Sequence, residues 1–199
     1  MTGSVQTNIE NNIKAMKRGS IIFPSSFDAF GNVEVVKKSL LRLEQKEFLV
    51  RLAHGIYLYP KQDKLLGTLY PSIEEIANAI AERDKARIIP TGIKALNQLG
   101  LSNQIPMNIV FLTDGAPRSI VVGKRTIKFK KTTPKNLAVK GKITGLIIQA
   151  LKEIGKDNIT AEQLEKISNH LKLEKEEIIE HDAKLAPAWI SQIIKNSKS

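Results

Sequence analysis

The apolar positions of the first sixty residues follow the pattern of several helices and then a β-hairpin. In the clearest helix, Val33, Val36, Leu40 and Leu43 recur at helical spacing, so we expect them to face a core. Two runs rich in β-branched and aromatic residues flank a turn at residues 54–55, which predicts a hairpin with Gly at the turn. The predicted elements are helices 8–16, 26–30 and 33–46, a strand-like segment 21–23, and strands 48–53 and 56–59.

Short polar residues that can cap helices stand just before several predicted helices. Such side chains accept hydrogen bonds from the first turn, so each one predicts where a helix begins. The predicted caps are Ser25, Asn32, Ser72, Thr91 and Thr160, the third and fifth of them within capping boxes.

Beyond residue 70 the pattern alternates between strands and helices. In the run 126–131, Ile127 and Phe129 alternate with Lys128 and Lys130, which predicts a strand with an apolar face and a basic face. The expected elements are helices 72–80, 92–99 and 134–155 with a restart near residue 141, strands 87–90, 108–113, 118–122 and 126–131, and helices after residue 160.

These elements predict an α+β protein with two domains. Residues 1–60 have the helix–helix–helix–hairpin plan of a winged helix-turn-helix, whose third helix enters the major groove of DNA. Residues 61–70 are expected to be a connector. Residues 71–199 are expected to form a mixed α/β domain with a basic β-hairpin, C-terminal helices and a helical tail.

The charge of the chain indicates which class of partner it binds. The chain has 199 residues, 42% of them hydrophobic, with a net charge of +11 and a pI near 9.8. Residues 108–142 hold nine Lys or Arg and a single acid, so most of the excess lies in one segment. A clustered basic segment indicates an anionic partner such as a nucleic acid.

The sequence lacks the residues that several kinds of catalytic and metal site need. With no cysteine and three scattered histidines, we expect no disulfide, metal site or other cofactor. Phosphate-loop and nucleophile-elbow motifs are absent, and Asp114 stands alone in the basic region, so we expect no catalytic residue and no enzyme. The acids around His181, from Glu174 to Asp182, are interpreted as a solvated helix face, and Trp189 is expected to pack its helix onto the body. No apolar run is long enough to span a membrane, and the default location is the cytoplasm.

Two sets of side chains are candidates for contact with DNA. On the predicted recognition helix and wing, exposed cations and amides could reach phosphates and base edges. These residues are Lys37, Lys38, Arg42, Gln45, Arg51 and His54. The second set would form a basic surface of the C-terminal domain, with a solubilising surface as the alternative. Its residues are Arg118, Lys124, Arg125, Lys128, Lys130 and Lys131.

The order and spacing of several segments resemble the AbiE-type abortive-infection antitoxin regulators. The N-terminal segments are 36–43 (VKKSLLRL) and 48–57 (FLVRLAHGIY). The later ones are 95–101 (ALNQLGL), 104–106 (QIP), 109–113 (IVFLT), Arg118 and 127–130 (IKFK). The resemblance covers about residues 8–155.

This resemblance implies a repressor that binds inverted repeats in double-stranded DNA at the operator of its own operon. It also implies the antitoxin role in a type IV toxin–antitoxin system, with a nucleotidyltransferase toxin as partner. In the family's pattern, Lys38, Arg42 and Arg51 would contact DNA, and the basic C-terminal residues would assist. Alternatives are an RNA-binding module, an enzyme acting on nucleic acid, and a winged helix that binds another protein.

Overall fold

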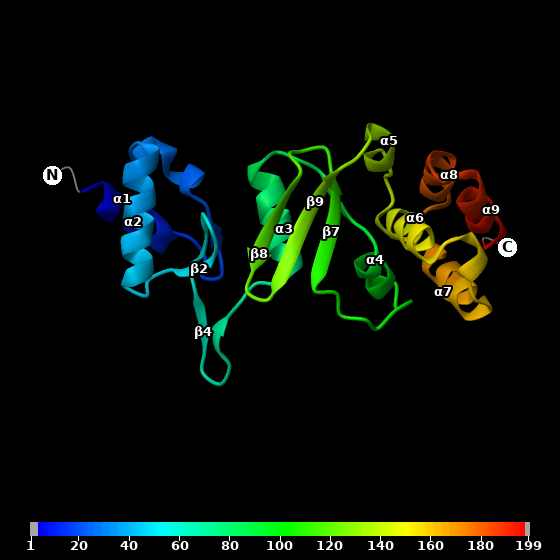
Figure 1. Cartoon of the computed structure of the whole chain (residues 1–199), viewed down its shortest axis with the longest axis horizontal. Coiled ribbons are helices and arrows are strands. Elements are labelled where there is room, and N and C mark those ends of the chain that lie inside the picture. Colours follow the sequence, from blue (N-terminus) through cyan, green and yellow to red (C-terminus); the bar gives the residue numbers. More distant parts are fainter. Residues whose placement is uncertain (1–3, 198–199) are drawn as a thin grey trace. The chain divides into compact units, whose positions relative to one another are not determined.

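The computed structural model describes residues 4–197 of the chain (Figure 1). The chain divides into two compact units, with the boundary between Ala79 and Ile80. Within the described residues, helices combine with three β-sheets, so the protein belongs to the α+β class. We describe each unit by itself.

Unit 1 begins with helices and a small antiparallel sheet. Its first elements are α1 (Val5–Ala15), β1 (Ile21–Ile22), the 3-10 helix η1 (Pro24–Phe30), α2 (Val33–Gln45), β2 (Val50–Ala53) and β3 (Ile56–Leu58). The strands lie in the order β1-β3-β2, and both pairings are antiparallel. The predicted hairpin is confirmed, and its turn places Gly55 at a φ of 68°.

The core of unit 1 is built largely from α1, α2 and aromatic side chains. On α2, Val36, Leu40 and Leu43 are buried as predicted, and the Asn32 side chain accepts a hydrogen bond from Val35 N at 2.9 Å. The prediction for Val33 is wrong, because this residue starts the helix and is 52% exposed. The fully enclosed members of the core are Ile9, Ile13, Ile22, Phe27, Val36, Leu40, Leu43 and Leu49.

Two predicted caps are wrong. η1 begins at Pro24 without a side-chain cap, so Ser25 lies inside this helix. Thr91 directly follows the strand Ile88–Pro90 and its N–H donates to Val110 O, and the helix Ile93–Gln98 begins only after Gly92. The φ of 62° at Gly92 turns the chain after Thr91, so the Thr91 hydroxyl does not stand at the helix start.

Residues 61–70, expected to be a connector, contain a second antiparallel hairpin in unit 1. Its strands are β4 (Lys61–Asp63) and β5 (Gly67–Leu69). The Gln62 amide donates to Thr68 Oγ1 across the strands at 3.0 Å. In Figure 1 this hairpin extends beyond the helices of its unit.

The unit boundary falls within α3 (Ile73–Arg83). The capping box predicted at its start is confirmed. Ser72 N donates to Glu75 Oε2 at 2.6 Å, and Glu75 N donates to Ser72 Oγ at 3.1 Å.

A four-stranded mixed sheet forms the first part of unit 2. Its strands are β6 (Ile88–Pro90), β7 (Asn108–Thr113), β8 (Arg118–Val122) and β9 (Arg125–Lys131). They lie in the order β6-β7-β9-β8, with β7 and β9 parallel and the other pairs antiparallel. The predicted alternation on β9 is confirmed, because Ile127 and Phe129 are buried and Lys130 is exposed.

Most of the remaining helices of unit 2 share a second core. The remaining helices are α4 (Ile93–Gln98), α5 (Pro134–Leu137), α6 (Lys142–Ile154), the 3-10 helix η2 (Lys156–Asn158), α7 (Ala161–Leu171), α8 (Glu176–Leu185) and α9 (Ala188–Asn196). Trp189 packs against this core, as predicted. The capping box of Thr160 is also confirmed at the start of α7. No helix between residues 4 and 197 has both the length and the apolar character needed to cross a membrane.

Candidate nucleic-acid interface

One side of α2 carries polar side chains that make no hydrogen bond or ion pair with other residues in 4–197. Because a helix turns every 3.6 residues, Lys38, Arg42 and Gln45 lie on one side, opposite the buried Val36, Leu40 and Leu43. All three are exposed, and none makes a hydrogen bond or ion pair with any residue in 4–197. We call Lys38, Arg42 and Gln45 the α2 face. Their donors remain available to a partner outside the chain.

Lys37 lies on the flank of the α2 face and is partly engaged. Its Nζ lies 3.2 Å from Glu34 Oε1, one helical turn away, and both side chains are exposed. Exposed pairs of this kind contribute roughly 0.2–1 kcal/mol. An external phosphate could therefore replace Glu34 as the partner of Lys37.

The β2–β3 hairpin holds the two other predicted residues of this unit. Arg51 and His54 are both exposed, and Arg51 Nη2 lies 3.1 Å from His54 Nδ1. A guanidinium only donates hydrogen bonds, so Nδ1 of His54 is the acceptor. His54 thus orients Arg51, which still has donors for a further anion.

The second predicted surface lies on the hairpin of β8 and β9. Lys124 lies at its turn, Arg125 begins β9, and Lys128, Lys130 and Lys131 follow along the strand. Lys128 and Lys130 lie on the side of β9 opposite Ile127 and Phe129, whereas Arg125 and Lys131 stand in the other phase at the two exposed ends of the strand. We call these five residues together the basic sheet face. Within the part of the chain that the structure describes, none of the five has an ion pair or hydrogen bond through its side chain.

Aromatic side chains lie on the other side of this sheet. Phe111 and Phe129 are buried, with ring centroids 6.0 Å apart. The register puts Ser119 and Val110 beside Lys128, and Leu112 beside Lys130. Recognition of single-stranded RNA on a sheet uses exposed aromatic rings for base stacking. The basic sheet face offers charge without such rings.

Arg118 differs from the other cations predicted for this surface. It lies opposite Phe129, in the buried phase of the sheet, and its guanidinium carbon is 5.5 Å from the Phe129 ring centroid. It also forms an ion pair with Asp84, and its side chain is only 31% exposed. Burial, and then the nearby Arg83 charge, lowers the pKa of the Arg118 guanidinium. The structure therefore separates Arg118 from the basic sheet face.

Unit 1 also contains cations that the sequence did not single out. Lys17, Arg18, Lys61 and Gln62 line a cleft of about 590 Å³, which we call the basic cleft. Arg18 is fixed there, because its Nη1 donates to Pro60 O at 3.1 Å and its guanidinium stacks 4.7 Å from the Tyr59 ring centroid. About forty residues separate the two sides of the cleft, so no local sequence pattern could reveal it.

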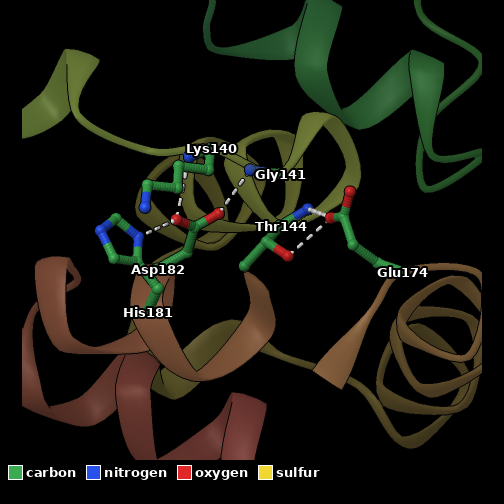
Figure 2. A network of polar contacts seen from close by, with 6 residues as sticks. All are labelled: Lys140, Gly141, Thr144, Glu174, His181 and Asp182. Atoms are coloured by element: carbon green, nitrogen blue, oxygen red, sulfur yellow. Dashed lines mark hydrogen bonds and ion pairs between the residues drawn. The ribbon is translucent and has the colours of Figure 1, made fainter. Parts of the chain in front are cut away.

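The acids near His181 have a structural role (Figure 2). Asp182 is fully buried and accepts hydrogen bonds from Lys140 N at 2.9 Å and Gly141 N at 2.7 Å. Glu174 accepts from both the backbone N and the hydroxyl of Thr144, each at 2.7 Å. These carboxylates satisfy the donors at the start of α6, so the predicted solvated face is wrong for Glu174 and Asp182.

The other candidate acid is also engaged. Asp114 accepts hydrogen bonds from the backbone and side chain of Arg87 at 2.8 and 2.9 Å, and these bonds hold its pKa below the usual range. Across residues 4–197, no group of three His, Asp or Glu side chains is arranged to hold a metal ion.

Comparisons with known proteins give the chain a family and a distant structural neighbour. The solved structures include a similar one, the RV2827C protein from Mycobacterium tuberculosis, at 10% sequence identity and a TM-score of 0.45. The match covers 100% of this chain and 83% of that one. No curated protein sequence matches the chain. Residues 8–179 match the family model described as a family of unknown function, DUF6088, and the chain therefore belongs to this family.

Proposed function

We propose that the chain is a non-enzymatic regulator that binds double-stranded DNA through a winged helix-turn-helix in unit 1. The observation that carries the proposal is the α2 face, whose Lys38, Arg42 and Gln45 have no partner within residues 4–197. The order of elements and the β1-β3-β2 sheet support it, because they match the plan of a winged helix. In this proposal α2 is the recognition helix and β2–β3 is the wing.

The proposed contacts follow from the chemistry of each side chain. Arg42 can donate two parallel hydrogen bonds to guanine, and Gln45 can pair with adenine in the major groove. Lys38 and Lys37 would contact phosphates as point charges. Arg51, held by His54, would reach the backbone beside the wing.

Unit 2 would add electrostatic affinity through the basic sheet face. By its resemblance to the AbiE-type regulators, the protein would repress its own operon and act as the antitoxin of a type IV pair. The cognate toxin would be a nucleotidyltransferase, and the protein would act in the cytoplasm. Binding of structured RNA through the basic sheet face is the second candidate, supported by five cations without a partner in residues 4–197.

Fluorescence anisotropy on the chain's own upstream DNA tests the proposal. We expect at least tenfold preference over a scrambled duplex, kept at moderate salt, and loss of that preference in the K38A/R42A double variant. Lys195→Ala, an exposed cation on α9, is the matched control and should bind like the wild type. Equal, salt-sensitive binding to both duplexes would overturn the regulator, and tighter binding to structured RNA would favour the second candidate.

A further inference from the structure

The β4–β5 hairpin ends in two leucines that the fold leaves in solvent. Leu65 is 94% exposed and Leu66 is 77% exposed. Single exposed apolar side chains are ordinary, but two adjacent ones at the end of a projecting hairpin form a small apolar point. We call Leu65 and Leu66 the leucine tip.

The turn that carries the leucine tip is held in one shape. Asp63 Oδ1 accepts hydrogen bonds from Leu65 N at 2.9 Å and from Leu66 N at 3.0 Å. These two bonds lower the pKa of Asp63, because they stabilise its ionised carboxylate. The two turn bonds and the cross-strand bond of Gln62 together preorganise the hairpin, so the two leucines are already exposed before a partner binds.

The surroundings of the leucine tip are basic. Lys64 precedes it directly, and the basic cleft of Lys17, Arg18, Lys61 and Gln62 lies at the base of the same hairpin. The one acid of the hairpin, Asp63, is already occupied by the turn. Exposed leucines flanked by cations are complementary to a polyanion whose charged backbone encloses stacked apolar groups.

We propose that the β4–β5 hairpin is a second DNA-binding element, in which the basic cleft holds backbone phosphates and the leucine tip inserts between base pairs from the minor groove. The inference rests on the proposed function. Architectural DNA-binding proteins insert Leu, Ile, Met, Phe or Pro wedges in this way and partly unstack one base step. The insertion would position unit 1 along the duplex in addition to the contacts of α2.

Lysines and leucines at a tip also suit an anionic membrane surface. DNA is favoured here because the same unit carries Arg51 and the α2 face, which has no partner within residues 4–197, and these side chains suit phosphates and base edges. Membrane binding is therefore an outcome that the test must detect.

The test uses the full-length protein and duplexes of the upstream DNA with 2-aminopurine scanned through single positions. This base fluoresces more strongly when it is unstacked. We expect wild-type protein to raise the fluorescence severalfold at one or two adjacent positions, and the L65A/L66A variant to abolish that rise while changing affinity less than tenfold. Leu173→Ala, which removes a 75% exposed leucine in unit 2, is the matched control and should behave like the wild type.

A second variant tests the cations separately. K17A/K61A should keep the fluorescence signal at saturation, weaken binding, and reduce the slope of log affinity against log salt by about two units. Thermal unfolding should be unchanged in all the variants, because the substituted side chains are exposed.

The outcomes separate this inference from the proposed function. If wild-type protein binds duplex DNA but L65A/L66A gives the same fluorescence rise, or no position responds, the hairpin proposal is overturned and the regulator stands. If wild-type protein does not bind duplex DNA, both fail. If anionic phosphatidylserine vesicles bind the wild type and not L65A/L66A, with no fluorescence response on DNA, the hairpin is a membrane contact and the proposal is overturned.

Discussion

At the scale of single residues, two arginines that the sequence predicts to contact a nucleic acid differ in their availability. Arg42 lies on the predicted recognition helix, and Arg118 lies in the basic segment 108–142. In the structure, Arg42 is exposed without a partner in residues 4–197, whereas Arg118 pairs with Asp84 over the Phe129 ring. Burial and pairing decide which cation is available to an external anion.

For Arg42 we predict a loss of sequence discrimination. Arg42→Ala should reduce the preference for the upstream DNA over random duplex by roughly 1–3 kcal/mol, because a bidentate contact to guanine is lost. Arg42→Lys keeps the charge but not the planar fork, so it should bind random DNA normally and still lose preference. Anisotropy on both duplexes measures this, and an unchanged preference in Arg42→Ala would contradict the readout role.

For Arg118 we predict an effect on stability rather than on DNA binding. Arg118→Ala removes an ion pair and a cation–π contact that are both partly solvated, which together contribute about 1 kcal/mol. The urea midpoint should fall slightly, and the salt dependence of DNA binding should stay the same. A reduced salt slope in this variant would return Arg118 to the DNA-binding set.

At the scale of elements, the start of α6 depends on carboxylates from distant parts of the chain. Asp182 accepts from the backbone N–H groups of Lys140 and Gly141, the two residues before α6, and Glu174 accepts from that of Thr144 in its first turn (Figure 2). Gly141 is required there, because a Cβ would lie against the Glu174 carboxylate and 2.8 Å from Ile178 Cγ2. These polar contacts join the start of α6 to α8 and to the residues just before α8, in addition to the apolar core that the two helices share.

We predict that Asp182→Asn destabilises the protein by about 2–4 kcal/mol, because an amide cannot accept from both buried donors. Urea unfolding followed by circular dichroism measures the change. Glu177→Gln removes an exposed acid from the first turn of α8 and should cost less than about 1 kcal/mol. Equal midpoints for Asp182→Asn and wild type would show that the buried carboxylate does not hold α6.

At the scale of the whole molecule, each unit carries its own set of cations that have no partner among residues 4–197. The α2 face belongs to unit 1 and the basic sheet face to unit 2. If both units contact the same DNA, each phosphate contact releases counterions, so the contacts of the two units add in the slope of log affinity against log salt.

We therefore predict a log–log salt slope near −5 for about six phosphate contacts. Neutralising Lys124, Arg125 and Lys128 to Ala should reduce this slope by about three units, because three contacts are removed. K184A/K195A, two exposed cations of the C-terminal helices, is the control and should leave the slope unchanged. An unchanged slope in the triple variant would assign the basic sheet face to another partner.

The sequence by itself determined the features that depend on a few neighbouring residues. The cap of Asn32, the capping boxes of Ser72 and Thr160, and the alternation along β9 were all predictable. Each is a hydrogen bond or a periodicity within one element, so the local chain carries the full signal. The exposed polar side of α2 could be read in the same way.

Only the tertiary structure decided which charges remain available. It buried Asp182 against α6, paired Arg118 with Asp84, and gathered Lys17, Arg18 and Lys61 into one cleft. It also showed that the expected connector is a hairpin that exposes two leucines. These features arise where segments that are distant in sequence meet, and burial and ion pairing depend on that meeting rather than on local residue order.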